Sequence, residues 1–129
     1  MKTIIESIPH NLQRYDTVGD WFFVNDTLVI RVSELKEPRH MFLVALHELW
    51  EAILCNDRGI TQEMVDIFDK DFEAHRHPDN LDEPGDSPNA PYRHEHSSAT
   101  GIERLLAAEL HVDWSTYEGE LNSLVYNPS

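Results

Sequence analysis

The sequence predicts an α+β fold in one small domain, and three observations lead to that prediction. Its 129 residues are enough for a single hydrophobic core and too few for two. Apolar residues make up 40% of the chain and charged residues 26%, which is typical of a globular protein. A β-rich stretch over residues 20–33 precedes four segments with the apolar spacing of helices. We therefore expect a hairpin followed by about four helices around one core.

The strands are expected at the start of the chain. Residues 20–33 hold two aromatic or β-branched runs separated by Asn25 and Asp26, which favour a turn, so the pattern predicts a β-hairpin. A short edge strand around Ile4 would end at Pro9, because proline cannot donate a hydrogen bond to a neighbouring strand.

The first helix is expected over residues 39–55. Pro38 suits the first helical turn, and Gly59 follows the last turn as a C-terminal stop signal. Nearly all side chains between Met41 and Cys55 are apolar. A helix that is apolar on almost every side is predicted to lie at the centre of the fold, buried all round.

Three further helices are expected, over residues 61–76, 92–111 and 114–125. Thr61 and Asp113 are the predicted N-caps of the first and last of these. Residues 78–91 are rich in proline and acids and predict a loop. The helix over residues 61–76 carries an acidic stripe that predicts a solvated face, namely Asp66, Asp69, Glu73 and His77.

Charge and cysteine content exclude several classes of protein. The chain has 24 acidic and 10 basic residues, a formal net charge of −14, which excludes nucleic-acid binding through direct basic contacts but not imitation of a nucleic acid. A single cysteine allows no internal disulfide and favours a reducing compartment such as the cytoplasm. No apolar run is long enough to predict a membrane span. Eight histidines are unusually many, and histidine is the commonest metal ligand.

The chemistry is expected in the helix over residues 39–55. Its central polar residues are His47, Glu48 and Glu51, and a buried carboxylate without a partner costs several kcal/mol. His47 and Glu51 lie one turn apart on one face, so a divalent metal bound by both would compensate the cluster. The alternative is that His47 makes a hydrogen bond in the core and Glu51 pairs with an arginine such as Arg104.

The segment His47-Glu48-Leu49-Trp50-Glu51 resembles the HExxH helix of zincin metallopeptidases. The resemblance implies that His47 is a ligand and that Glu48 is the general base. Glu51 stands where the family has its second histidine. A carboxylate there makes the site richer in oxygen, so zinc is the expected ion and manganese or iron are alternatives.

A third ligand is expected from one of two histidine clusters. In the helix over residues 92–111, His96, Thr100 and Glu103 share a face that continues with apolar residues and therefore points inward. This favours His96 as the third ligand, with Glu103 as a fourth ligand or as a hydrogen-bond partner of a ligand. The alternatives to His96 are His75, His77 and His94.

The sequence also resembles small uncharacterised proteins encoded by phages and prophages, and this resemblance implies a phage setting and no particular reaction. The segments that carry it are residues 14–17, 19–21, 47–55, 83–86, 102–110 and 112–114.

The function expected from these observations is divalent-metal binding by a zincin-like helix, with metal-dependent, peptidase-like hydrolysis if the protein is an enzyme. A purely structural metal that joins two helices is the first alternative. An acidic interaction protein, such as a phage inhibitor or DNA mimic acting on a host protein in the host cytoplasm, is the second. Substrate and oligomeric state are not predicted.

Overall fold

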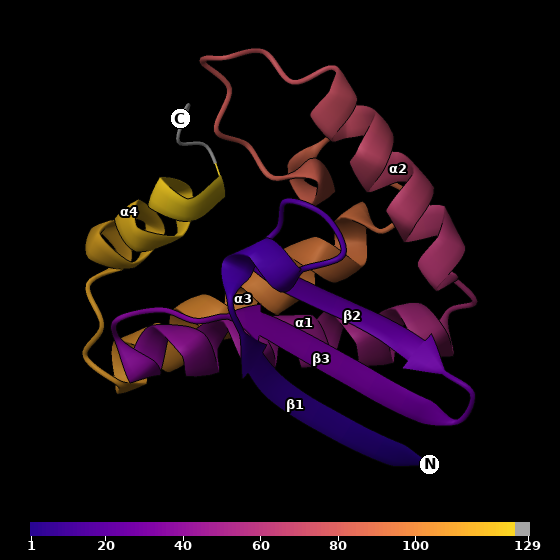
Figure 1. Cartoon of the computed structure of the whole chain (residues 1–129), viewed down its shortest axis with the longest axis horizontal. Helices are drawn as coiled ribbons and strands as arrows, with labels where there is room; N and C mark the ends of the chain where they lie inside the picture. The colour runs from indigo at the N-terminus through magenta and orange to yellow at the C-terminus, as the bar shows by residue number, and fades with distance from the viewer. Residues whose placement is uncertain (126–129) are drawn as a thin grey trace.

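The α+β class predicted from the sequence is confirmed by a computed structural model, which describes residues 1–125 as a three-stranded sheet and four α-helices in one small domain (Figure 1). The strands are β1 (Lys2–Ile8), β2 (Gly19–Val24) and β3 (Thr27–Ser33). The helices are α1 (Pro38–Asp57), α2 (Gln62–Ala74), α3 (Arg93–Glu109) and α4 (Trp114–Val125), with short 3-10 turns η1 (His10–Leu12) and η2 (Pro84–Asp86).

The sheet has the strand order β1-β3-β2. β2 and β3 form the predicted antiparallel hairpin around Asn25 and Asp26, and Asn25 adopts the positive φ of 55° that such a tight turn requires. β1 is an edge strand, as expected, and pairs with β3 in parallel. The loop between β1 and β2 contributes residues 15–18 to the wall of a cavity beside α1.

α1 lies between the sheet and α3 (Figure 1). It packs on β2 and β3 and makes its most extensive helix contact with α3. The core between these layers is formed by residues from every one of them, including Trp21, Leu28, Ile30, Val32, Leu43, Ala52, Ala107 and Tyr117. Cys55 belongs to this core, and burial raises the pKa of its thiol to about 12, so it remains protonated at neutral pH.

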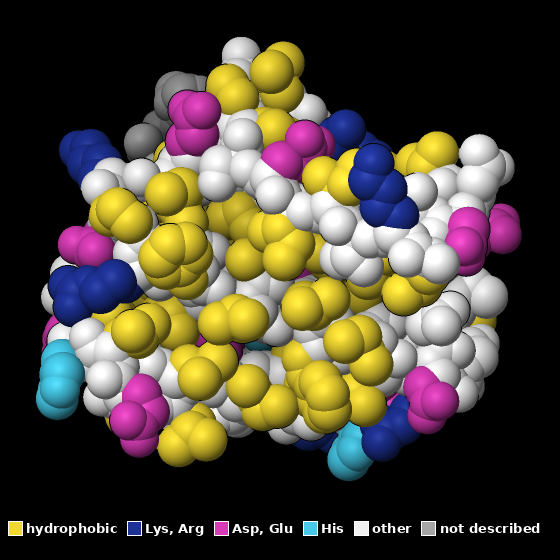
Figure 2. Space-filling view, turned by 90° about the horizontal axis from the view of Figure 1, so that it is seen from below, with side chains coloured by type: hydrophobic (Ala, Val, Ile, Leu, Met, Phe, Trp, Pro, Cys, Tyr) yellow, Lys and Arg dark blue, Asp and Glu magenta, His cyan; other side chains and the backbone are white. Residues whose placement is uncertain are grey.

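The expectation that α1 is buried on every side is wrong. Phe42, Leu46 and Ile53 are exposed, at 59%, 38% and 45% of their surface. The sheet and α3 cover only part of the helix circumference, and hydrophobicity alone does not tell which faces receive a partner. Figure 2, seen from the side on which β1 and α1 lie, shows apolar side chains gathered over a broad area. By contrast, three polar residues of α1 are buried, namely His40, His47 and Glu51.

Helix termini follow their predicted caps. The Thr61 side chain accepts a hydrogen bond from the Met64 backbone, and Asp113 accepts one from the Thr116 backbone. α1 begins at Pro38, one residue before its predicted start, and ends at Asp57, two residues after its predicted end. Within residues 1–125, no helix has the length and apolar character needed to cross a membrane.

Truncating the core is expected to destabilise the fold strongly. Leu43 is fully buried on α1, so Leu43→Ala should lower the free energy of unfolding by about 2–5 kcal/mol through lost burial and the cavity left behind. Leu105→Ala is the matched control, because Leu105 is 62% exposed. Urea denaturation of both variants measures the difference, and equal losses would contradict the described packing.

Candidate metal centre

Three polar side chains from neighbouring turns of α1 line one cavity. His47 and Glu51 lie one above the other on the same face, and both are buried. Glu48 lies about 100° further round the helix and is half-buried. The packing of α1 against α3 excludes water from the face that holds His47 and Glu51.

α3 supplies His96 and Glu103, which lie two helical turns apart and are both buried. Glu103 Oε1 is 2.7 Å from His47 Nδ1. The Tyr117 hydroxyl on α4 donates a hydrogen bond of 2.5 Å to the other oxygen of Glu103. The series Tyr117–Glu103–His47 therefore fixes the orientation of the His47 ring from the side that faces away from Glu51.

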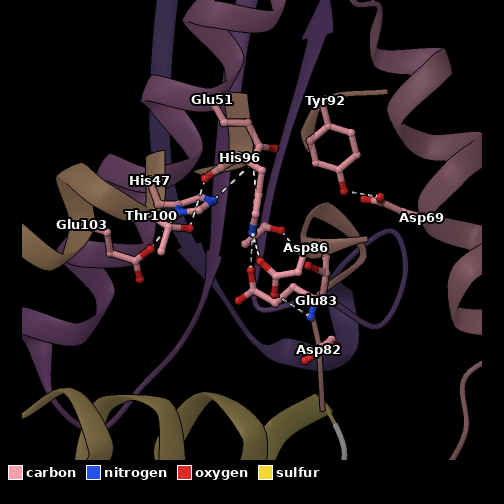
Figure 3. A network of polar contacts seen from close by, with 12 residues as sticks. His47, Glu51, Asp69, Asp82, Glu83, Asp86, Tyr92, His96, Thr100 and Glu103 are labelled. Carbon is pink, nitrogen blue, oxygen red and sulfur yellow. Dashed lines mark hydrogen bonds and ion pairs between the residues drawn. The ribbon is translucent and has the colours of Figure 1, made fainter. Parts of the chain in front are cut away.

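His47, Glu51 and His96, here called the inner triad, meet in one small volume (Figure 3). Glu51 Oε2 lies 3.2 Å from His47 Nε2 and 2.9 Å from His96 Nδ1. The Trp21 indole nitrogen on β2 donates a hydrogen bond of 3.0 Å to the second oxygen of Glu51. His47 and Glu51 are thus each held by a further contact outside the triad.

Burial and mutual contact shift the pKa values of the triad. Burial opposes charge on Glu51, yet its contacts with His47 and His96 lower the pKa of this carboxyl. Burial also opposes charge on His47, and its hydrogen bonds with Glu103 and Glu51 raise the ring's pKa well above the usual value. Positive charge is therefore stabilised where the triad meets, and a metal ion can supply it in place of the ring protons.

The donor set fits a divalent transition-metal ion. Two imidazole nitrogens and one carboxylate oxygen are ligands that zinc, manganese and iron accept. Ligands about 2.0–2.2 Å from such an ion lie about 3.0–3.5 Å from one another. The separations of 3.2 and 2.9 Å from Glu51 Oε2 are close to this range, and the donor atoms of the triad all lie within 4.8 Å of one another.

A cavity of about 110 Å³ lies beside the inner triad, which gives room for several water molecules or a small polar group. His47, Glu51 and His96 all line it. Its described lining contains neither Lys nor Arg but many carboxyl groups, namely Asp16, Asp20, Glu48, Glu51, Asp66, Asp69, Glu73, Glu83 and Glu103. Such a lining attracts cations and repels anionic ligands.

Glu48 faces this cavity without a hydrogen-bond partner among residues 1–125. Burial, and then the negative charge of Glu51, raise the pKa of Glu48 well above its usual value. The β2 backbone passes close by at Gly19, where a Cβ would lie 2.5 Å from Glu48 Oε1. Glu48 is therefore packed into a defined position beside the triad and retains oxygens that can exchange a proton.

The site residues predicted from the sequence lie close together in the structure, but they occupy different positions relative to the point where the triad meets. His47, Glu51 and His96 converge, Glu48 lies beside them, and Glu103 contacts His47 rather than the meeting point. The three alternatives to His96, His75, His77 and His94, are exposed.

The alternative to a metal is confirmed in its first part, because His47 makes a hydrogen bond of 2.7 Å with Glu103 in the core. Its second part, a pair between Glu51 and Arg104, is wrong. Arg104 is exposed, and its guanidinium stacks 4.3 Å from the centre of the Trp114 ring. The buried partners of Glu51 are instead two histidines and a tryptophan.

The prediction that the acidic stripe of α2 is solvated is wrong for Asp69, which is 6% exposed. Both Tyr15 and Tyr92 donate hydrogen bonds from their hydroxyls to its carboxyl group. A signal was present in the sequence, because Asp69 lies one turn after Val65 and one turn before Phe72, on the apolar face of the helix.

Sequence reasoning also missed the ion pairs that hold the loop before β2. Arg14 contacts Asp20 at 2.7 Å and Asp66 on α2 at 2.9 Å. Arg14 and Asp66 are 52 positions apart in the sequence, so no local sequence pattern predicts that they meet. Asp20 and Asp66 both line the cavity, so Arg14 joins β2 and α2 at its edge.

Comparisons with protein-family models, with curated proteins and with solved structures gave no match. The function proposed below is therefore inferred from the geometry of the site.

Asp69 is expected to make stability depend on pH. Burial raises the pKa of Asp69 from 3.8 to about 7, so between these values the folded protein holds a proton that the unfolded chain has lost. The contribution of Asp69 to the free energy of unfolding therefore falls as pH rises from about 4 to 7, by up to about 1.4 kcal/mol per pH unit. Above pH 7 this contribution is constant.

Urea denaturation between pH 4.5 and 8 with a chelator present measures this dependence. The stability difference between wild type and Asp69→Asn should fall over that range. Asp71→Asn, at an exposed position of the same helix, should remain parallel to wild type. Parallel curves for both variants would show that Asp69 is ionised as in water.

Proposed function

We propose that this chain binds one divalent transition-metal ion, with zinc as the expected metal, through His47 Nε2, Glu51 Oε2 and His96 Nδ1. The convergence of these three atoms at separations of 2.9 and 3.2 Å is the observation that carries the proposal. The far nitrogen of each ring faces a carboxylate, Glu103 for His47 and Glu83 for His96. At His47 this carboxylate would hold the ring proton and leave Nε2 free as a ligand, whereas Nε2 of His96 lies near Glu83 without a well-directed hydrogen bond.

The reaction we propose is metal-dependent hydrolysis of a small amide or peptide bond. A bound ion would supply Lewis-acid activation of a water molecule. Glu48 is the residue that would accept the proton of that water and return it to the leaving group, once the positive charge of the ion has lowered the raised pKa of its carboxyl. The cavity of about 110 Å³ favours a small substrate or a single residue over an extended peptide.

A purely structural ion is the second candidate, and the connections of the triad favour it. Trp21, Glu103 and Tyr117 link the triad to β2, α3 and α4, so an ion there would join three parts of the fold. In that case Glu48 would have no chemical role.

The acidic interaction protein has weaker support. Nine of the 24 acidic residues line the cavity instead of forming an outer row of phosphate-like charges. The phage setting and the host cytoplasm remain part of the proposal through the sequence resemblance and the buried, unpaired Cys55.

Metal content is expected to depend on the inner triad. Purified untagged wild type, reconstituted with zinc or manganese and then desalted, should hold one ion per chain by elemental mass spectrometry. His47→Ala and His96→Ala should lose it, because each removes a ligand. His75→Ala is the control, since its ring is 77% exposed and outside the triad. Equal content in all four proteins, or none in wild type, would overturn the proposed metal site.

Glu48→Gln separates the catalytic from the structural candidate. The variant should keep its ion and its melting temperature, because Glu48 is not a proposed ligand. Hydrolysis of a panel of aminoacyl amides that wild type cleaves should fall by about 10²–10⁴-fold, the usual contribution of a general base. Retained ion with unchanged turnover would exclude Glu48 as the base. A retained ion in a wild type without hydrolytic activity would favour the structural role.

A further inference from the structure

The His96 ring has a second polar edge, directed away from the inner triad. Its Nε2 lies 2.9 Å from Glu83 Oε2 and 3.4 Å from Asp86 Oδ1 (Figure 3). His96 is only 5% exposed, and among the described residues Nε2 has no hydrogen-bond partner of acceptable direction. Nε2 therefore faces two carboxylates without a well-directed hydrogen bond to either, and a cation shared by the three groups would satisfy all of them.

These three atoms have the spacing of a cation site. Neighbouring ligands of a first-row divalent ion lie about 3.0–3.5 Å apart, and the two distances from Nε2 are 2.9 and 3.4 Å. One imidazole nitrogen with two carboxylate oxygens suits manganese, iron or zinc better than calcium, which takes oxygen ligands.

The segment that presents the carboxylates is organised by its own contacts. Asp86 uses its second oxygen to accept a hydrogen bond of 3.2 Å from the Glu83 backbone, which leaves Oδ1 for His96. Between them, Gly85 lies directly against the ring, since a Cβ there would be 2.3 Å from His96 Cγ. η2 is thereby held against the imidazole.

The site is also placed between solvent and the triad. The side chains of Glu83 and Asp86 are 52% and 50% exposed, whereas those of the inner triad are less than one-tenth exposed. Glu83 lines the same cavity as His47 and Glu51. An ion held by Glu83 and Asp86 would therefore be accessible from water, and Glu83 would hold it at the edge of the cavity that the triad also lines.

We propose that Glu83, Asp86 and His96 Nε2 form an outer site, which captures a divalent transition-metal cation from solvent and delivers it to the inner triad. This inference rests on the proposed function for its destination, but the outer site itself does not require the inner one.

The shared ring makes the two sites alternatives. A neutral imidazole offers one lone pair and keeps one N–H, so a ring that ligates through Nε2 presents Nδ1–H to Glu51. When the ion moves to Nδ1, the ring exchanges its proton with water and presents Nε2–H to Glu83. The expected occupancy is therefore one ion per chain in wild type.

The first test measures the rate of capture. The double variant Glu83→Gln/Asp86→Asn should take up Co²⁺ at least about tenfold more slowly in stopped-flow absorbance, with an unchanged final stoichiometry of one. Asp79→Asn/Asp82→Asn removes the same charge from exposed positions of the same loop and should bind at the wild-type rate. Equal rates for the two double variants would overturn the proposal.

The second test isolates the outer site in His47→Ala, which breaks the inner triad. This variant should bind one Co²⁺ more weakly than wild type in equilibrium dialysis. Adding Glu83→Gln/Asp86→Asn should abolish that binding, whereas adding Asp79→Asn/Asp82→Asn should not. No residual binding, or binding insensitive to Glu83 and Asp86, would contradict the outer site.

These outcomes separate the two proposals. If wild type and His47→Ala bind Co²⁺ equally and both need Glu83 and Asp86, the outer site stands and the inner metal site fails. If wild type binds tightly through His47 but the loop variants change neither experiment, the inner site stands and the outer site fails.

Discussion

The buried carboxylate of Glu51 is the constraint on which the site depends. It contacts His47 from its own helix, His96 from α3 and the indole nitrogen of Trp21 from β2, so the three layers of the fold meet at its two oxygens. A buried carboxylate is tolerated only where positive charge and hydrogen bonds compensate its lost hydration. The relative position of α1, α3 and the sheet is therefore set by these polar contacts as well as by apolar packing. Removal of Glu51 would leave His47 and His96 without the negative charge that both rings contact.

The fold could be predicted where the sequence has local patterns. The turn-forming pair Asn25 and Asp26 predicted the hairpin, and the N-caps Thr61 and Asp113 predicted where two helices begin. The candidate site could be predicted as far as helical spacing reaches, because positions 47 and 51, and likewise 96 and 103, share faces whatever the tertiary structure. Contacts set only by packing could not be predicted in this way. The sequence does not show that η2 folds back on His96 or that α2 turns Asp69 toward two tyrosines, since these depend on how distant segments approach one another.

The two histidines of the inner triad have unequal surroundings, and this difference bears on how an ion would exchange. Beyond His47 lies Glu103, buried and tied to Tyr117 on another helix. Beyond His96 lie Glu83 and Asp86, half-exposed and carried by a short turn in a loop. Replacing the first set of contacts with water would require α1, α3 and α4 to separate. Replacing the second requires only a movement of side chains at the surface. Ligand exchange is therefore expected on the His96 side, while His47 keeps its orientation throughout.

Two glycines place bare backbone against the reactive side chains. A Cβ at Gly19 would lie within 2.8 Å of both Glu48 and Val44, and one at Gly85 would lie within 2.8 Å of three atoms of the His96 ring. The ring has little freedom to move away from such a contact, because Glu51 contacts its Nδ1 at 2.9 Å. The Glu48 carboxyl has more freedom, since it faces the cavity. A side chain at residue 85 would consequently displace a proposed ligand, whereas one at residue 19 would displace the proposed base and leave the ligands in place. The backbone at Gly85 and at Gly19 thus limits the positions of the proposed ligand and of the proposed base, and both glycines line one cavity.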